Sequence, residues 1–195
     1  MKQRSIVALI ICLGLYCSIT VPSISQAHVG TESIPVIAEM EYRIYVDLNP
    51  KDIELRNKYG MLLLNRNKIS EAESQFTLIL SMAPKNFDAM DALGLVRIKQ
   101  QRYPEAVKLL QDAIVINPKD VAVYLHLGKA LEATGQSKPA ENAYENGLRL
   151  LKPAAGTSTP TGKQTKDEEA ALRSALQNLR AKTAVSSQKH KEVTK

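Results

Sequence analysis

The sequence contains no tryptophan, and aromatic residues make up only 5% of its 195 positions. So few aromatic side chains disfavour a β-sandwich. The only two cysteines, Cys12 and Cys17, follow the bulky residues Ile11 and Tyr16, which do not suit a lipid-attachment site. The chain beyond Cys17 therefore has no disulfide, no thiolate metal site and no cysteine nucleophile, which suits an oxidising compartment.

The first 27 residues have the three-part layout of a secretory signal peptide. Lys2 and Arg4 precede an apolar run over 6–21, and the small-residue triplet 25–27 follows. The run is shorter than the roughly 20 residues that span a bilayer as a helix. We therefore expect cleavage after Ala27 and export, with the periplasm as the location. The alternative is an uncleaved leader that anchors the protein in the inner membrane.

The net charge of +6 is concentrated at the two ends of the chain. Residues 152–195 carry nine basic and four acidic side chains, whereas 28–151 are almost balanced. This balance gives no reason to expect a nucleic-acid partner. A basic tail is usually a solvated tail, and contact with a polyanion or a membrane surface is its alternative function.

The chain also lacks a catalytic constellation. We find no glycine-rich phosphate loop and no serine-centred elbow, and none of the three histidines has a second metal ligand at the usual spacing. The sequence therefore predicts a protein that is not an enzyme and has no cofactor and no metal.

What the sequence does contain is a 34-residue repeat. Pro50 precedes two further prolines at this interval, and glycine, alanine and large apolar residues recur in the same way. Several independent columns at one period indicate stacked structural units. The structural repeat positions are Gly60, Ala72, Phe76, Pro84, Gly94, Ala106, Leu110, Pro118, Gly128, Ala140 and Tyr144.

Each unit is predicted to be a pair of helices. Asp52, Asn86 and Asp120 stand where a first helix would begin, with a side-chain oxygen able to accept from the free N–H groups of the first turn. The second helix ends before the next proline, since the residue preceding proline is pushed out of helical geometry. Glycine inside a helix costs about 1 kcal/mol, so three glycines at one period predict close packing between helices.

These columns resemble the tetratricopeptide repeat, whose pattern is Trp-x2-Leu-Gly-x2-Tyr, then Ala-x3-Phe, then Pro. The tryptophan column is lost in all three units, and Arg97 departs from the aromatic position. The resemblance implies an all-α fold, a solenoid of three helix-pair repeats with an N-terminal cap helix and a C-terminal helix. The expected order is signal peptide 1–27, cap helix 35–48, repeats 53–86, 87–120 and 121–152, flexible linker 153–166, C-terminal helix 167–183 and disordered basic tail 184–195.

The two flanking helices are needed because a terminal repeat leaves an apolar face open. We expect the leucine stripe of helix 167–183 to fold back over the third repeat; the alternatives are a free helix awaiting a partner, or self-association in the groove of another chain. That stripe is Leu172, Leu176 and Leu179. The face of the cap helix expected against the first repeat is Ile37, Met40, Ile44, Tyr45 and Leu48.

The resemblance implies that the function is binding. Stacked first helices of such repeats line a concave groove that holds a peptide or helix of a partner protein. The chain would then be an interaction scaffold, and we expect it to serve assembly of an envelope complex. The Lys/Asn/Arg clamp that grips chaperone C-termini is absent. The expected groove residues are Asn57, Met61, Asn65, Asp91, Leu95, Lys99, Leu125, His126 and Lys129.

Overall fold

A computed structural model describes residues 35–151 and 163–193, which form eight α-helices and no strand. The predicted signal peptide and residues 153–162 of the predicted linker lie outside the described residues. The chain divides into one unit that ends at Ala38 and a second that begins at Glu39, and the architecture below is that of the second unit.

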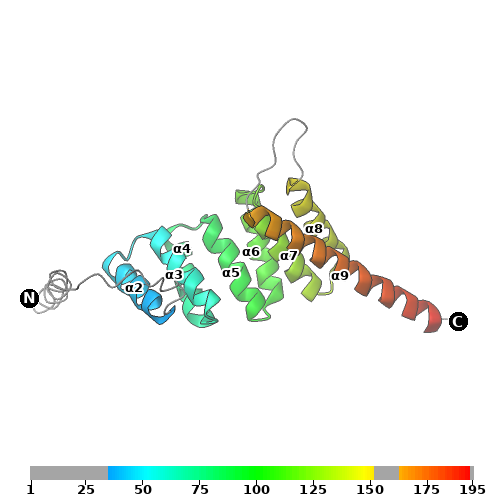
Figure 1. The fold of residues 1–195 in the computed structure, drawn as a ribbon, viewed down its shortest axis with the longest axis horizontal. Helices are drawn as coiled ribbons and strands as arrows, with labels where there is room; N and C mark the ends of the chain where they lie inside the picture. Colours follow the sequence, from blue (N-terminus) through cyan, green and yellow to red (C-terminus); the bar gives the residue numbers. More distant parts are fainter. Residues whose placement is uncertain (1–34, 152–162, 194–195) are drawn as a thin grey trace, which may run out of the picture. The chain divides into compact units, whose positions relative to one another are not determined.

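The prediction of an all-α repeat fold is confirmed. Three helix pairs follow one another along the chain, and one helix flanks them on each side (Figure 1). The N-terminal flanking helix ends just before Pro50, and the second helices of the first two pairs end just before Pro84 and Pro118, as the proline column predicts. The helices are α2 (Pro35–Leu48), α3 (Ile53–Asn65), α4 (Ile69–Met82), α5 (Phe87–Lys99), α6 (Tyr103–Ile116), α7 (Val121–Ala133), α8 (Ser137–Leu151) and α9 (Lys163–Val193).

The predicted caps begin the first helix of every repeat. The side-chain oxygens of Asp52, Asn86 and Asp120 accept from the backbone N–H three residues on, at 2.9, 2.8 and 3.2 Å. Each bond satisfies a donor that has no partner within the helix. The start of each repeat is therefore decided by local chemistry.

The first helices also end alike, which the sequence analysis did not foresee. Asn67, Gln101 and Gly135 have positive φ angles and are spaced by the repeat length. The residue after each donates its N–H to a carbonyl five positions back, as in the Schellman motif. Gly135 and Asn67 are residue types typical of this position, because glycine adopts positive φ angles without strain and asparagine does so more readily than most residues.

The repeated glycines mark close packing inside each helix pair. A Cβ at Gly60, Gly94 or Gly128 would lie within 2.8 Å of the side chain of Phe76, Leu110 or Tyr144, respectively. Those three side chains are fully buried, as are the alanines four residues before them. The absence of a side chain at the glycine therefore lets a large apolar residue fill the space between the helices, as the columns predict.

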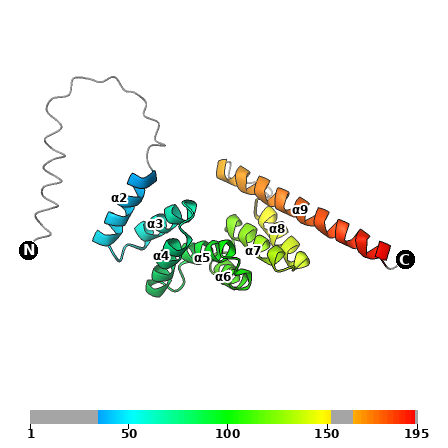
Figure 2. The same cartoon turned by 90° about the horizontal axis from the view of Figure 1, so that it is seen from below.

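The stack of repeats has an inner side formed by the first helices. α3 contacts α5, and α5 contacts α7, whereas no contact joins α4 with α6 or α6 with α8 in the described part of the chain. The first helices thus lie closer together than the second helices, which places α3, α5 and α7 on the inner side of the curve (Figure 2).

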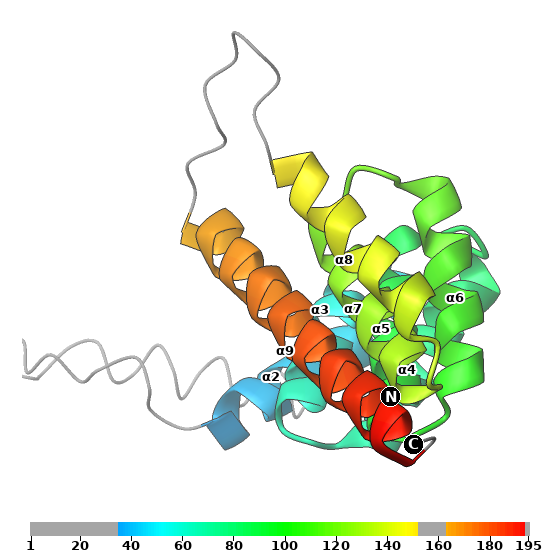
Figure 3. The ribbon, with the colours of Figure 1, turned by 90° about the vertical axis from the view of Figure 1, so that its right-hand side faces the viewer.

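Helix α9 packs against α8 and α7, as seen along the stack in Figure 3. Leu172, Leu176 and Leu179 are buried in one cluster with residues of those helices, which confirms the fold-back expectation. The predicted bounds are wrong, because α9 begins at Lys163 and continues through the supposed disordered tail to Val193. No proline or glycine interrupts 163–193, so good helix formers continue the helix.

The prediction for the face of α2 is wrong. Met40, Ile44, Tyr45 and Leu48 are exposed, and the side chain of Ile37 lies outside the described residues. The opposite face packs instead: its three contacting residues are Glu39, Tyr42 and Val46. Val46 is buried in the cluster of the first two repeats, with Tyr42 packed against it, and the Glu39 carboxylate pairs with Arg66 and Lys68. An apolar face and an ion pair together position α2.

An ion-pair network links the first two repeats. The guanidinium of Arg97 donates to the Glu73 carboxylate, which also accepts from the Gln100 amide. Burial alone would raise the pKa of Glu73, but these hydrogen bonds and the charges of Arg97 and Arg102 hold the pKa below its usual range. The ionised carboxylate therefore stabilises the folded state.

We expect Glu73→Gln to lower the free energy of unfolding by about 1 kcal/mol at pH 7. A carboxyl with a lowered folded pKa stabilises above its unfolded pKa of about 4.3, and this stability is lost as the pH falls through the folded value. The difference from wild type should thus shrink between pH 5 and pH 3 in urea unfolding. Glu71→Gln, at a more exposed pair with Lys68, should change stability little; an equal loss there would contradict the assignment.

Candidate functional site

The predicted groove residues all belong to the first helices of the three repeats, α3, α5 and α7. Eight of the nine are at least partly accessible to solvent. They combine amides, charges of both signs and apolar side chains, a mixture that suits the backbone and side chains of a peptide. We call them the inner surface: Asn57, Met61, Asn65, Asp91, Leu95, Lys99, His126 and Lys129.

Leu125 is the exception, and its assignment to the groove is wrong. Only 8% of its surface is exposed, and it belongs to the cluster that contains Leu127 and the leucines of α9. His126, the next residue, occupies the accessible position instead. Because α7 is covered on one side by α9, its apolar face is wider than that of a helix between two repeats alone.

The structure brings Asp91 and His126 together. Nδ1 of His126 lies 2.7 Å from Oδ1 of Asp91, so the pair bridges α5 and α7. Each side chain is less than one-fifth exposed. The pair ties the second repeat to the third and fixes both side chains at the inner surface. The sequence placed the two residues on the same surface but gave no sign that they pair.

Asn57 carries an acceptor without a partner. Its Oδ1 is buried and accepts no hydrogen bond from any described residue. A buried polar atom left unpaired costs about 1–3 kcal/mol, and an N–H donor of a ligand could pair with this one only after the Asn57 side chain turned outward. Met61, one turn along α3, is 37% exposed and offers an apolar contact beside it.

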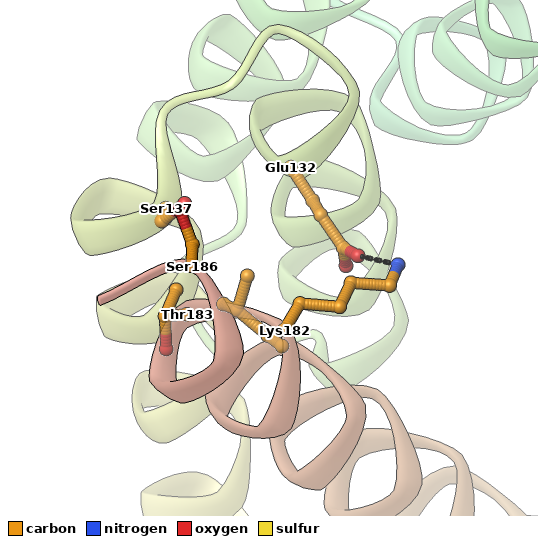
Figure 4. A pocket seen from close by; sticks show the side chains of 6 residues that line it. Glu132, Ser137, Lys182, Thr183 and Ser186 are labelled. Atoms are coloured by element: carbon orange, nitrogen blue, oxygen red, sulfur yellow. Dashed lines mark hydrogen bonds and ion pairs between the residues drawn. The ribbon is translucent and has the colours of Figure 1, made fainter. Parts of the chain in front are cut away.

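A hollow of about 440 Å³ lies where α9 meets the end of α7 and the start of α8 (Figure 4). Glu132 is one of the lining residues: one of its carboxylate oxygens accepts from Lys182 at 2.6 Å, and the other accepts from the buried Tyr144 hydroxyl at 3.2 Å. Burial raises the pKa of the Tyr144 phenol, and the Glu132 carboxylate adds to that effect. Sequence reasoning missed this site because its residues come from segments that meet only on folding. The lining is Glu132, Ser137, Leu179, Lys182, Thr183 and Ser186.

Among the described residues, no three histidine, cysteine, aspartate or glutamate side chains gather where they could hold a metal ion. No described helix is long and apolar enough to cross a membrane.

Comparison with known proteins supports the interpretation of the repeats. Residues 94–135 match a family model described as TPR repeat. This chain carries tetratricopeptide repeats. Its repeats resemble those of the BBSome complex member BBS4 of Bos taurus, with 30% identity over 116 residues that make up 60% of the chain and 22% of the relative. The type IV pilus assembly protein PilF of Pseudomonas aeruginosa is 25% identical over 136 residues, 64% of the chain and 52% of PilF.

The tetratricopeptide fold is also found in similar solved structures. The type III secretion chaperone SycD of Yersinia enterocolitica, in complex with a peptide of the translocator YopD, superimposes with a TM-score of 0.57 at 16% identity. The match covers 67% of this chain and 93% of SycD. At this identity the likeness establishes the fold alone.

Arginine replaces an aromatic residue of the tetratricopeptide pattern at two positions. Arg56 takes the tryptophan place; it is buried and donates to the Gln75 side chain at 2.6 Å and the Pro50 carbonyl at 2.8 Å. Arg97 takes the tyrosine place and pairs with Glu73. Hydrogen bonds thus hold these helices where an aromatic side chain would pack.

Proposed function

We propose that this chain is a non-enzymatic scaffold that holds an extended peptide or a helix of a partner protein against the inner surface. The observation that carries the proposal is the partly exposed Asn57 side chain one turn from the exposed Met61 on α3. The first can accept from a peptide N–H group, and the second can contact an apolar side chain.

The tetratricopeptide fold supports binding to a protein partner. The similar protein SycD has been solved in complex with a peptide of the translocator YopD. We propose further that the protein is exported, that it lies in the periplasm or is anchored to the inner membrane, and that it assists assembly of an envelope complex. The leader sequence motivates this location, and the similarity to the pilus assembly protein PilF motivates the role.

Of the two alternative functions of the C-terminal region, membrane or polyanion binding through the basic tail stays a proposal, because the side chains from 187 on lie outside the described residues. The other alternative loses support. Self-association through the leucine stripe needs an exposed stripe, but Leu172 is fully buried within its own chain.

The test is affinity capture from envelope extract with the full chain and two triple variants. The inner variant combines Asn57→Ala, Asn65→Ala and Lys129→Ala. The outer variant combines Lys108→Ala, Gln111→Ala and Asn142→Ala, which removes the same chemical groups from exposed positions on α6 and α8.

We expect capture of a specific protein to fall at least about tenfold with the inner variant, since a few central contacts carry most binding energy. Capture by the outer variant should equal wild type. Circular dichroism of both variants should be unchanged, because the substituted residues are exposed or half-exposed. Equal capture by all three proteins would contradict binding at the inner surface.

A further inference from the structure

The Asp91–His126 pair determines which nitrogen of the imidazole ring carries the proton. Nδ1 of His126 lies 2.7 Å from Oδ1 of Asp91. An ionised carboxylate has acceptors only, so the ring must donate across this contact. In a neutral imidazole one nitrogen donates and the other accepts. The proton therefore lies on Nδ1, and Nε2 keeps its lone pair.

The lone pair on Nε2 of His126 is free to accept a hydrogen bond. Within the described part of the chain, the ring is bonded to the Asp91 carboxylate through Nδ1 alone. The buried side-chain atoms of these residues that lack a hydrogen bond belong to Arg56, Asn57 and Arg97. Nε2 is not among those buried atoms, and the side chain of His126 is 15% exposed. Nε2 is therefore an accessible acceptor on a ring that Asp91 holds in place.

The composition of the inner surface favours one kind of peptide for this acceptor. A helical ligand lays a stripe of apolar side chains into an apolar groove, and its main-chain N–H groups are bonded within the helix. Met61 and Leu95 are the apolar members of the inner surface, whereas its other members are polar. An extended peptide has free main-chain N–H groups, and these need acceptors when they leave water.

We propose that Nε2 of His126 accepts a hydrogen bond from a main-chain N–H group of an extended peptide, and that Asp91 is the positioning residue that makes Nε2 the acceptor. This inference rests on the proposed function and narrows it, because it selects an extended peptide over a helix. Without the Asp91 carboxylate the proton is free to move to Nε2, which would then face the peptide N–H as a second donor.

Nitrogen NMR of the full chain with labelled histidine tests the role of Asp91 at pH 7. The chain has three histidines, and the signals of His126 are those that disappear in His126→Asn. We expect the proton of wild-type His126 on Nδ1, and we expect Asp91→Ala to move it toward Nε2. A wild-type ring protonated on Nε2 or on both nitrogens would overturn the proposal, as would an unchanged proton position in Asp91→Ala.

The contact with the ligand is tested with a peptide selected on the full chain from a phage-displayed library of random peptides. Peptides that bind the inner variant as well as they bind wild type are discarded. Each main-chain N–H of the selected peptide is then replaced by N-methyl, one position at a time. His126→Asn is the matched variant, because its shorter amide can still donate to Asp91 but has no acceptor at the place of Nε2.

We expect His126→Asn to weaken binding of the unmodified peptide about two- to tenfold, as for the loss of one hydrogen bond. It should not weaken binding of the peptide methylated at the contacting N–H, since that bond is already absent. An equal loss with every methylated peptide, or a peptide that binds as a helix, would overturn the inference and leave the proposed function standing. A library that yields no peptide dependent on the inner surface would overturn both.

Discussion

Replacement of Gly128 by alanine is expected to lower the free energy of unfolding by about 1–3 kcal/mol, since overpacking of a filled core is costly. The added Cβ would lie 2.2 Å from a ring carbon of Tyr144. That ring is fully buried, and its hydroxyl donates to Glu132. The clash therefore outweighs the gain of about 1 kcal/mol that alanine normally brings to a helix interior.

Chemical denaturation of the Gly128→Ala and Gly94→Ala variants measures how much free energy of unfolding each substitution removes. The Cβ at Gly94 would lie 2.7 Å from a terminal methyl carbon of Leu110, and a flexible leucine gives way more readily than an aromatic ring. Gly94→Ala should therefore cost less. If Gly128→Ala proved neutral or stabilising, the glycine column would not be a packing requirement.

Replacement of Leu172 by alanine is expected to remove about 2–4 kcal/mol of stability, as for other large-to-small changes in a core. Leu172 is fully buried between α9 and the α7–α8 pair, close to Gly147. α9 takes the place that the first helix of a fourth repeat would occupy, because it contacts both helices of the preceding pair. Its release would expose the apolar face of the third repeat.

Denaturation and limited trypsin digestion together measure the effect. Digestion at Arg173, Arg180 and Lys182 should become faster in Leu172→Ala, since these bonds are protected only while α9 is docked. Leu150→Ala is the control: Leu150 is another leucine of the same region but is 37% exposed, and its truncation should cost under about 1 kcal/mol. Equal losses at both positions would show that α9 does not stabilise the repeats.

The exposed apolar face of α2 is a feature that the sequence analysis predicted wrongly. Apolar residues at helical spacing occur on both faces of this helix: Tyr42 and Val46 on one, Met40 and Ile44 on the other. Periodicity alone cannot choose between two apolar faces. Which face of α2 packs depends on the positions of Arg66 and Lys68, because both form ion pairs with Glu39 on the packed face.

The bounds of α9 fail for a different reason. The leucine stripe ends at Leu179 and predicts a helix as long as its packed part. Local propensity carries the helix beyond the stripe, since no residue from Lys163 to Val193 breaks it. An apolar pattern marks only the part of a helix that packs.

The sequence by itself determined the repeat, the helix pairs and their caps, because these depend on contacts that recur at a fixed interval or lie within one turn. Phe76 meets Gly60 and Tyr144 meets Gly128 across the same sequence separation, so the pattern is visible without coordinates. The tertiary structure alone decided the packed face of α2, the Asp91–His126 pair and the hollow around Glu132. Each of these joins different helices at positions that no column repeats, and only the folded geometry brings such side chains together.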